Sequence, residues 1–187
     1  LFFEGKHASI MHVIYERKME EAEKSSSAAQ KKRLYEECIE LTSGGVDGAA
    51  YLKLIDAMKE DDHIFRVEEA QRLERILFVH QEELEESLQL YTEICFRVGK
   101  LFWYYYDCGN GQDSPAVRAQ YAAPWFEEVL RAAPENYPGR GMARAYSDIG
   151  RFYREITTSI TEAEDEGRYR AFVEDLAFLL SNFPADE

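Results

Sequence analysis

The sequence contains few prolines, few cysteines and few basic residues relative to acidic ones. Its 187 residues include five prolines and three cysteines, and 36 Asp and Glu outnumber 22 Lys and Arg. The scarcity of proline, with a hydrophobic content of 45%, favours a folded helical chain over a disordered one. The formal net charge of −14 argues against nucleic acid or an anionic membrane as a partner, because both are bound through concentrated Lys and Arg.

The cysteines are odd in number and widely spaced, at Cys38, Cys95 and Cys108. No C-x-x-C pair occurs, so the sequence indicates neither a disulfide framework nor a zinc site. We expect reduced thiols in a cytoplasmic protein, with Cys95 buried on the apolar face of a helix.

Long apolar runs and enzyme motifs are also missing. No stretch approaches the roughly 20 consecutive apolar residues of a membrane helix, which predicts a soluble protein. The chain begins at Leu1 without methionine or a signal-like segment, as expected of a piece of a longer protein. Phosphate-loop, Gly-x-Ser-x-Gly and His-Glu-x-x-His motifs are absent, so we expect no enzyme activity, cofactor or metal. Acidic pairs such as Glu36-Glu37 and Glu82-Glu83 are typical of solvated helix surface.

Residues 1–60 contain three short amphipathic segments. Helices are predicted over 8–23 and 28–41, separated by three serines that suggest an antiparallel hairpin. Asp47 is a candidate N-cap for a third helix, whose apolar residues are Tyr51, Leu54, Ile55 and Met58.

A heptad-like seam predicts one long helix over 62–107, on the order of 65 Å at 1.5 Å per residue. Such a seam can also pair two copies of a chain, which makes a homodimer the alternative reading. Polar residues weaken the seam at its middle, where we expect His80 to be a hydrogen-bonded structural residue. The seam consists of Ala70, Leu73, Leu77, His80, Leu84, Ser87, Tyr91, Ile94, Val98, Leu101 and Tyr105.

Two loops punctuate the remainder, at 109–115 and 136–141. A helix is predicted to restart with Ser114 as its cap and Pro115 at its first position. Another is predicted over 143–164. Strict alternation of apolar and polar residues is absent, so a sheet is not expected.

The second half of the chain repeats one pattern. Tyr146, Ile149, Gly150 and Tyr153 occupy relative positions 0, 3, 4 and 7, which is one face of a helix. Glycine in mid-helix costs about 1 kcal/mol against alanine, so Gly150 is expected to allow close approach of a neighbouring helix. A second apolar helix follows, with Phe172, Leu176, Leu179 and Pro184. The other copy consists of Val98, Gly99, Phe102, Ala122, Phe126, Val129 and Pro134.

These residues resemble the tetratricopeptide repeat (TPR), whose pattern runs large apolar, Leu, Gly, Tyr on its first helix and Ala, Phe, Ala, Pro on its second. The two glycines lie 51 residues apart rather than roughly 34, which implies irregular hairpins with lengthened helices or loops. A weaker resemblance, carried by residues 100–106 and 146–153, is to helical segments that accompany protein-kinase or other signalling domains in bacterial proteins.

Basic residues gather opposite the apolar face of the helix that contains Tyr146. Arg140, Arg144, Arg151 and Arg154 lie within about 80° at 100° per residue. On the earlier helix, Arg97, Lys100 and Tyr104 similarly avoid the apolar stripe, and Trp103 supplies a further ring. In the resembled repeats the first helices line a concave groove, where arginine can bind carboxylates or phosphates. The plain alternative is a solvated helix face.

Together these features predict an all-α, TPR-like array of antiparallel hairpins with one long central helix. We expect a single helical-repeat domain over 1–187, with short helices in 1–60 and the long helix and two hairpins in 62–187. The predicted function is a noncatalytic interaction or scaffold module of a larger bacterial signalling protein. A protein or acidic peptide would bind Arg97, Lys100, Trp103, Tyr104, Arg144, Arg151 and Arg154. The alternative function is homo-oligomerisation through the heptad seam.

Overall fold

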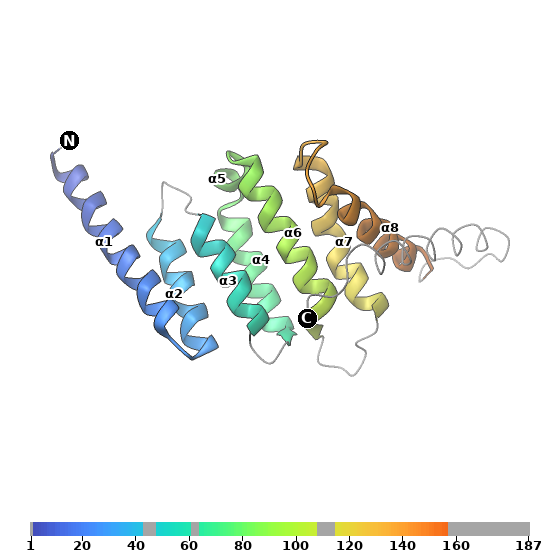
Figure 1. The fold of residues 1–187 in the computed structure, drawn as a ribbon, viewed down its shortest axis with the longest axis horizontal. Helices are drawn as coiled ribbons and strands as arrows, with labels where there is room; N and C mark the ends of the chain where they lie inside the picture. Colours follow the sequence, from blue (N-terminus) through green and yellow to red (C-terminus); the bar gives the residue numbers. More distant parts are fainter. Residues whose placement is uncertain (1, 43–47, 61–63, 108–114, 157–187) are drawn as a thin grey trace. The chain divides into compact units, whose positions relative to one another are not determined.

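The structure is a computed structural model that describes residues 2–42, 48–60, 64–107 and 115–156. These residues form eight helices and two strands of two residues each, which confirms the all-α prediction. Figure 1 shows successive helices running in alternating directions within each part of the chain. In chain order the elements are α1 (Phe2–Lys24), α2 (Ala28–Leu41), α3 (Gly48–Glu60), β1 (Phe65–Arg66), α4 (Val67–Val79), α5 (Gln81–Glu85), α6 (Leu88–Tyr105), β2 (Tyr106–Asp107), α7 (Pro115–Ala132) and α8 (Arg140–Ile156).

Contacts divide the chain into two compact units. Unit 1 spans Leu1–Leu90 and unit 2 spans Tyr91–Glu187, so the boundary falls in the first turn of α6. The single helical-repeat domain over 1–187, with short helices in 1–60 and the remaining elements in 62–187, stays a prediction.

Unit 1 begins with the predicted hairpin of α1 and α2. Helix α2 has the predicted bounds, because Ser27 caps it: the Ser27 hydroxyl accepts a hydrogen bond of 3.3 Å from the Gln30 N–H. Helix α1 ends at Lys24, directly before the serines as expected, but it begins at Phe2, six residues before the predicted start. Helix α3 then packs against α2, and its four predicted apolar residues are each at most 3% exposed. The proposed cap Asp47 lies outside the described residues.

The prediction of one continuous helix over 62–107 is wrong. The segment is divided among β1, α4, α5, α6 and β2, with breaks at His80 and at Glu86-Ser87. At His80 the backbone leaves the helical region, with φ −106° and ψ 15°. The His80 ring lies 3.2 Å from Glu83 through Nδ1 and packs edge-on against Tyr51 at 6.2 Å. His80 is therefore the structural residue expected from the sequence, but its contacts accompany a bend rather than a straight seam.

The apolar seam residues are nevertheless buried. Leu73, Leu77 and Leu84 in unit 1 are 1%, 6% and 0% exposed, and Ile94 and Val98 in unit 2 are both 0% exposed. Short helices with breaks at the polar seam positions thus bury the same residues that a straight helix would have aligned. These side chains belong to the core of the chain, so a homodimer through the seam would require that core to open.

Unit 2 packs α6, α7 and α8 around the ring of Tyr146, which is 1% exposed. Its ring centroid lies 4.3 Å from that of Trp103 on α6 and 4.7 Å from that of Phe126 on α7. Close ring pairs of this kind add to the free energy gained by burying apolar area. One aromatic side chain of α8 therefore joins both other helices of the unit.

Gly150 allows α8 and α7 to approach closely, as predicted. A Cβ at this position would lie 2.4 Å from the Cβ of Ala123 and 2.5 Å from the backbone oxygen of Ala119. Gly99 serves the same purpose on α6, where an added Cβ would lie 2.8 Å from the ring of Phe126. Both glycines of the repeated pattern are thus positions of close contact between helices.

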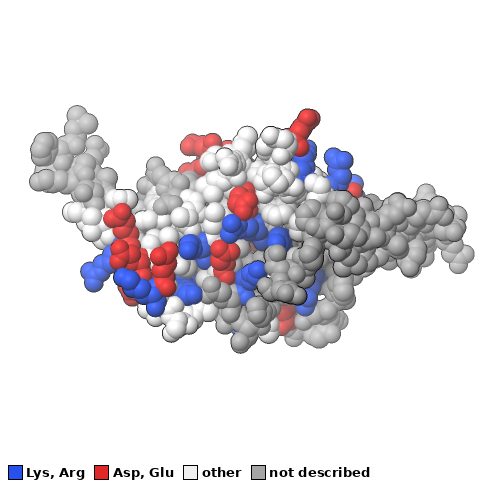
Figure 2. All heavy atoms as spheres, in the orientation of Figure 1, with Lys and Arg blue, Asp and Glu red and all other residues white. Residues whose placement is uncertain are grey.

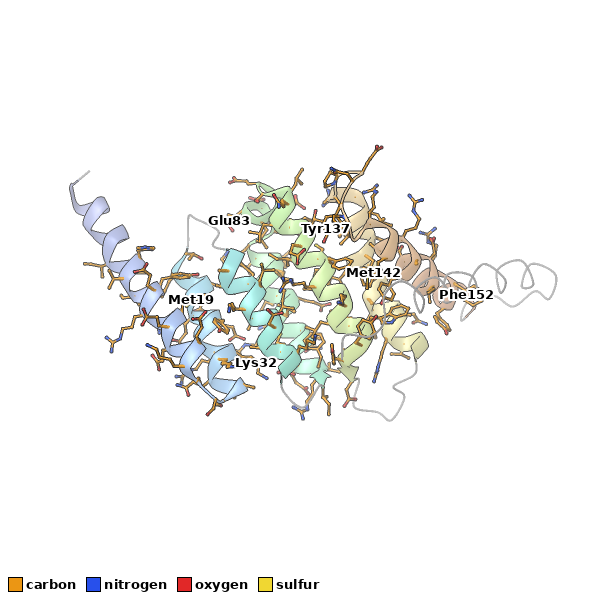
Figure 3. The ribbon with its side chains drawn as sticks, viewed as in Figure 1. Met19, Lys32, Glu83, Tyr137, Met142 and Phe152 are labelled. Atoms are coloured by element: carbon orange, nitrogen blue, oxygen red, sulfur yellow. The ribbon has the colours of Figure 1, made fainter. Side chains whose placement is uncertain are left out.

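The turn between α7 and α8 packs against α6 through Tyr137, labelled in Figure 3. The Tyr137 and Phe96 rings meet edge-on at 5.9 Å. Helix α8 begins at Arg140, three residues before the predicted start, and α7 begins at Pro115 as predicted. The proposed cap Ser114, the end of the predicted 143–164 helix and the second-helix pattern Phe172–Pro184 lie outside the described residues.

Two of the three cysteines are described, and both are fully buried. Cys38 on α2 and Cys95 on α6 are each 0% exposed, which confirms the prediction for Cys95. Cys108 lies outside the described residues. Among the helices that the structure describes, none combines the length and apolarity needed to cross a membrane.

Replacing Gly150 by alanine is expected to destabilise unit 2. Overpacking of this kind costs about 1–3 kcal/mol, and here the contact includes backbone that cannot rotate away. Gly141, which is exposed near the start of the same helix, provides the control. Gly141→Ala should leave stability unchanged or raise it by up to about 1 kcal/mol. Urea unfolding followed by circular dichroism measures both, and equal effects would contradict the close-contact role.

Replacing Leu77 by glutamate is expected to unfold unit 1 rather than to separate two copies. The side chain is 6% exposed, so the variant would bury an unpaired carboxylate, a change that can cost more than about 4 kcal/mol. Light scattering should give a monomer mass for the unaltered chain, and circular dichroism should show lost helicity in the variant. A dimer that the substitution converts into a folded monomer would instead support pairing through the seam.

Candidate functional site

The two predicted aromatic binding residues are used in packing. Trp103 and Tyr104 are half-buried, and both contact Tyr146 of α8. The Tyr104 and Tyr146 hydroxyls share a hydrogen bond. The Tyr104 backbone oxygen accepts a hydrogen bond of 3.1 Å from Arg118, which satisfies a carbonyl at the end of α6. These rings hold α6 against α8 and present only part of their surface to a partner.

Arg97 is held by neighbouring side chains. Its Nε donates to Glu93 Oε1 at 2.7 Å, and the other oxygen of Glu93 accepts from the Tyr137 hydroxyl at 3.1 Å. Burial, reinforced by the Glu93 charge, raises the pKa of Tyr137, so this tyrosine stays protonated and keeps donating. A ligand carboxylate would have to displace Glu93 before it could engage the Nε of Arg97.

The same combination of side chains recurs between α6 and α7. The Tyr91 hydroxyl donates to Glu128 at 3.1 Å, and Arg131 donates to the same oxygen at 2.8 Å through Nε. The Arg131 guanidinium also lies 5.9 Å from the centroid of the Tyr91 ring. Burial again raises the pKa of the tyrosine. Each Tyr–Glu–Arg set joins helix α6 to a neighbouring segment. Neither set was predicted, because such polar contacts leave no periodic pattern of apolar residues in the sequence.

The arginines of α8 differ in their engagement. Arg140 donates to the backbone oxygen of Ala133 at 2.8 Å and so satisfies a carbonyl at the end of α7. Arg151 forms an ion pair of 3.4 Å with Asp148, and both side chains are exposed. Arg144 is exposed and forms no ion pair with a described residue. The side chain of Arg154 lies outside the described part of the chain.

The predicted binding residues of α6 and α8 do not line a single surface. At 100° per residue, Arg144 and Arg151 lie about 160° and 140° around α8 from Tyr146, which contacts α6. Trp103 and Tyr104 face Tyr146, so the arginines of α8 are turned away from the aromatic residues of α6. Lys100 is half-buried on α6 and has a partner of its own. The contacts therefore separate a basic face of α8, formed by Arg144 and Arg151, from the residues on α6.

Unit 1 contains a pocket of about 400 Å³. Basic and acidic side chains are interspersed over α1 to α3 in Figure 2, and the pocket has the same mixed character. Lys53 forms an ion pair of 3.4 Å with Glu23 across it. Two cations face two anions, so the pocket favours no ligand of a single charge. Its lining consists of Glu23, Lys31, Tyr35, Lys53, Asp56 and Ala57.

The acidic pair on α2 departs from the predicted solvated surface. Glu36 is only 7% exposed and is paired with Arg72 of α4, whereas its neighbour Glu37 is paired with Lys18 of α1. Burial raises the pKa of Glu36, although Arg72 opposes the shift. The hydrogen bond from Lys18 lowers the pKa of Glu37. Adjacent residues thus join α2 to two different helices. The sequence feature that could have indicated the burial of Glu36 is its position between the apolar residues Tyr35 and Cys38, both of which are buried.

In the part of the chain that the structure describes, no group of three or more His, Cys, Asp or Glu side chains could hold a metal ion. The chain was also compared with protein-family models, with curated proteins and with solved structures, and no match was found.

Glu36→Gln and Glu37→Gln are expected to change the pH dependence of stability in opposite directions. A raised folded-state pKa at Glu36 gives stability that is present below pH 4.5 and is lost as the pH rises through the folded value. A lowered pKa at Glu37 gives stability that is present above pH 4.5 and is lost on acidification. Urea unfolding of both variants and the unaltered chain across this range measures the difference. Parallel curves for the two variants would contradict the assignment.

Proposed function

We propose that this chain is a noncatalytic protein-interaction module, built of irregular TPR-like hairpins, that serves a larger bacterial signalling protein. The support comes from the architecture of short helices in alternating directions, with glycine at two close contacts of the repeated pattern. Helical hairpin scaffolds of this kind bind partners on exposed helix faces. The partner proposed is an acidic peptide or an acidic segment of a protein.

Arg144 carries the proposal. It is exposed on α8, and no described residue neutralises it. Arg151 lies seven residues further on, about 20° away around the helix, so the two guanidinium groups line the same face two turns apart. The ion pair of Arg151 with Asp148 is exposed, and such pairs contribute about 1 kcal/mol or less. A ligand carboxylate can therefore replace Asp148 at little cost.

The net charge of the chain makes this face selective. A chain of −14 repels acidic ligands over most of its surface, and charge complementarity governs orientation and the rate of encounter. An acidic peptide that binds in spite of this repulsion has to contact a locally basic surface. The structure separates this face from the α6 residues that the sequence grouped with it, so the proposed surface is limited to α8. Those α6 residues have partners of their own and are Arg97, Lys100, Trp103 and Tyr104.

Replacing Arg144 by glutamate is expected to weaken binding of a fluorescein-labelled helical peptide of Glu, Leu and Ala by tenfold or more, which is about 1.4 kcal/mol. The substitution removes the positive charge of Arg144 and places a like charge against the ligand. Fluorescence anisotropy at low salt measures the affinity, and circular dichroism verifies that helicity is retained.

Arg17→Glu is the matched control, because Arg17 is an exposed arginine on α1 and the change in net charge is the same. If both variants weaken binding equally, net charge and not the basic face determines the affinity. If the unaltered chain does not bind the peptide at all, an acidic ligand for this face is ruled out.

A further inference from the structure

Three large apolar side chains are exposed where α4, α5 and α6 meet. Phe78 and Val79, the last residues of α4, are 77% and 67% exposed, and Leu88, the first residue of α6, is 54% exposed. We call these three residues the apolar corner. Adjacent exposed apolar residues of this size differ from the singly scattered ones that are normal on protein surfaces.

The bend at His80 creates this corner. Leu77 and Leu84 are 6% and 0% exposed, so they anchor the end of α4 and the short helix α5 to the core. Phe78 and Val79 follow Leu77 by about 100° and 200° around the helix, which turns both away from that core. Since α5 contains only five residues, it brings the exposed end of α4 and the start of α6 to the same junction. The burial of Leu77 and Leu84 therefore fixes the orientation in which Phe78 and Val79 are exposed.

Glutamates predominate in the segment that contains the apolar corner. Residues 74–90 contain five glutamates, whereas Arg75 and His80 are the basic residues in the same segment. Glu82 and Glu86 are exposed and form no ion pair with a described residue. Figure 2 shows acidic atoms gathered at the edge where α5 lies, and Figure 3 labels Glu83 in this region. The five glutamates are Glu74, Glu82, Glu83, Glu85 and Glu86.

We propose that the apolar corner and its glutamates form a second docking surface, which binds a basic amphipathic helix of another protein. Apolar side chains spaced at i, i+3 or i+4 on such a helix would cover Phe78, Val79 and Leu88. Its flanking Lys and Arg would face Glu82 and Glu86. This surface belongs to unit 1, whereas the arginines of α8 belong to unit 2, and it takes a ligand of the opposite charge.

Charge decides between the proposed occupant and two others. A second copy of the chain also carries −14, so the two copies repel each other over most of their surfaces. An anionic membrane would be repelled by the same glutamates. A basic helix is the occupant for which both the apolar and the acidic parts of the surface are complementary.

The experiment uses a fluorescein-labelled synthetic peptide of Leu and Lys whose leucines lie on one helical face. A scrambled peptide of the same composition has the same charge but no apolar face. Fluorescence anisotropy on the full 187-residue chain should show binding of the amphipathic peptide at least tenfold tighter than binding of the scrambled one. Equal affinity for the two peptides would mean that only net charge attracts them and would overturn the proposal.

Val79→Ser is expected to weaken binding of the amphipathic peptide by about fivefold, and Phe78→Ser by tenfold or more. Val13→Ser is the control, because Val13 is 60% exposed on α1 in the same unit. All three side chains are exposed, so the variants should keep their helicity. A loss in Val13→Ser as large as that in Val79→Ser would place the peptide elsewhere and reject the apolar corner.

The double variant Glu82→Gln/Glu86→Gln should weaken binding by about tenfold and reduce its dependence on salt. Its control is Glu20→Gln/Glu21→Gln on α1, which removes the same charge from another surface. If the two double variants bind equally, the glutamates of the corner have no specific role and the proposal fails. Light scattering of the chain alone provides the last test, because a dimer dissociated by Phe78→Ser would show that a second copy occupies the surface.

Discussion

Close contact at glycine, where a β-carbon does not fit, is the constraint on which the helix packing of unit 2 depends. Gly99 and Gly150 in unit 2 lie where any β-carbon would overlap a neighbouring helix. In unit 1 a β-carbon at Gly48 would lie 2.4 Å from the end of the Leu90 side chain, which can rotate away. With the helices this close, the Tyr146 ring of unit 2 fits between Trp103 and Phe126, and the Tyr–Glu–Arg sets reach from one segment to the next. The helix contacts therefore combine small residues on the backbone with large rings beside them.

Local sequence rules predicted the features that depend on local interactions. Helix α2 was predicted to the residue, because Ser27 caps it and few other signals compete there. The close-contact role of Gly150 was predictable, since its cost in a helix demands a compensating contact. The bend at His80 was not, because a seam of apolar residues is compatible both with one helix and with several short ones that bury the same face. At the bend, His80 makes a local contact with Glu83 and a tertiary contact with Tyr51, and the apolar pattern specifies neither.

Charge was the least predictable property of the surface. Helix periodicity placed Arg140, Arg144 and Arg151 on one face, but it did not reveal that a backbone carbonyl engages the first and Asp148 the third. Likewise, the sequence predicted that Glu36 and Glu37 are both solvated, whereas Glu36 is buried and Glu37 is more exposed. Such pairings form between segments distant in sequence, or depend on rotamers that periodicity does not specify. Helix periodicity therefore predicts the face on which a charged side chain lies. Whether that side chain can bind a ligand depends on the ion pairs and hydrogen bonds that it already forms.

The buried cysteines give each unit a chemical reporter. Cys38 belongs to unit 1 and Cys95 to unit 2, and neither thiol is accessible in the folded chain. Only the thiolate reacts with alkylating reagents, and a thiol sealed in a core reacts only when its surroundings open. Mass spectrometry after brief alkylation would resolve the two sites by their peptides. The relative labelling of Cys38 and Cys95 thus reports how often each unit opens, without any substitution in the chain.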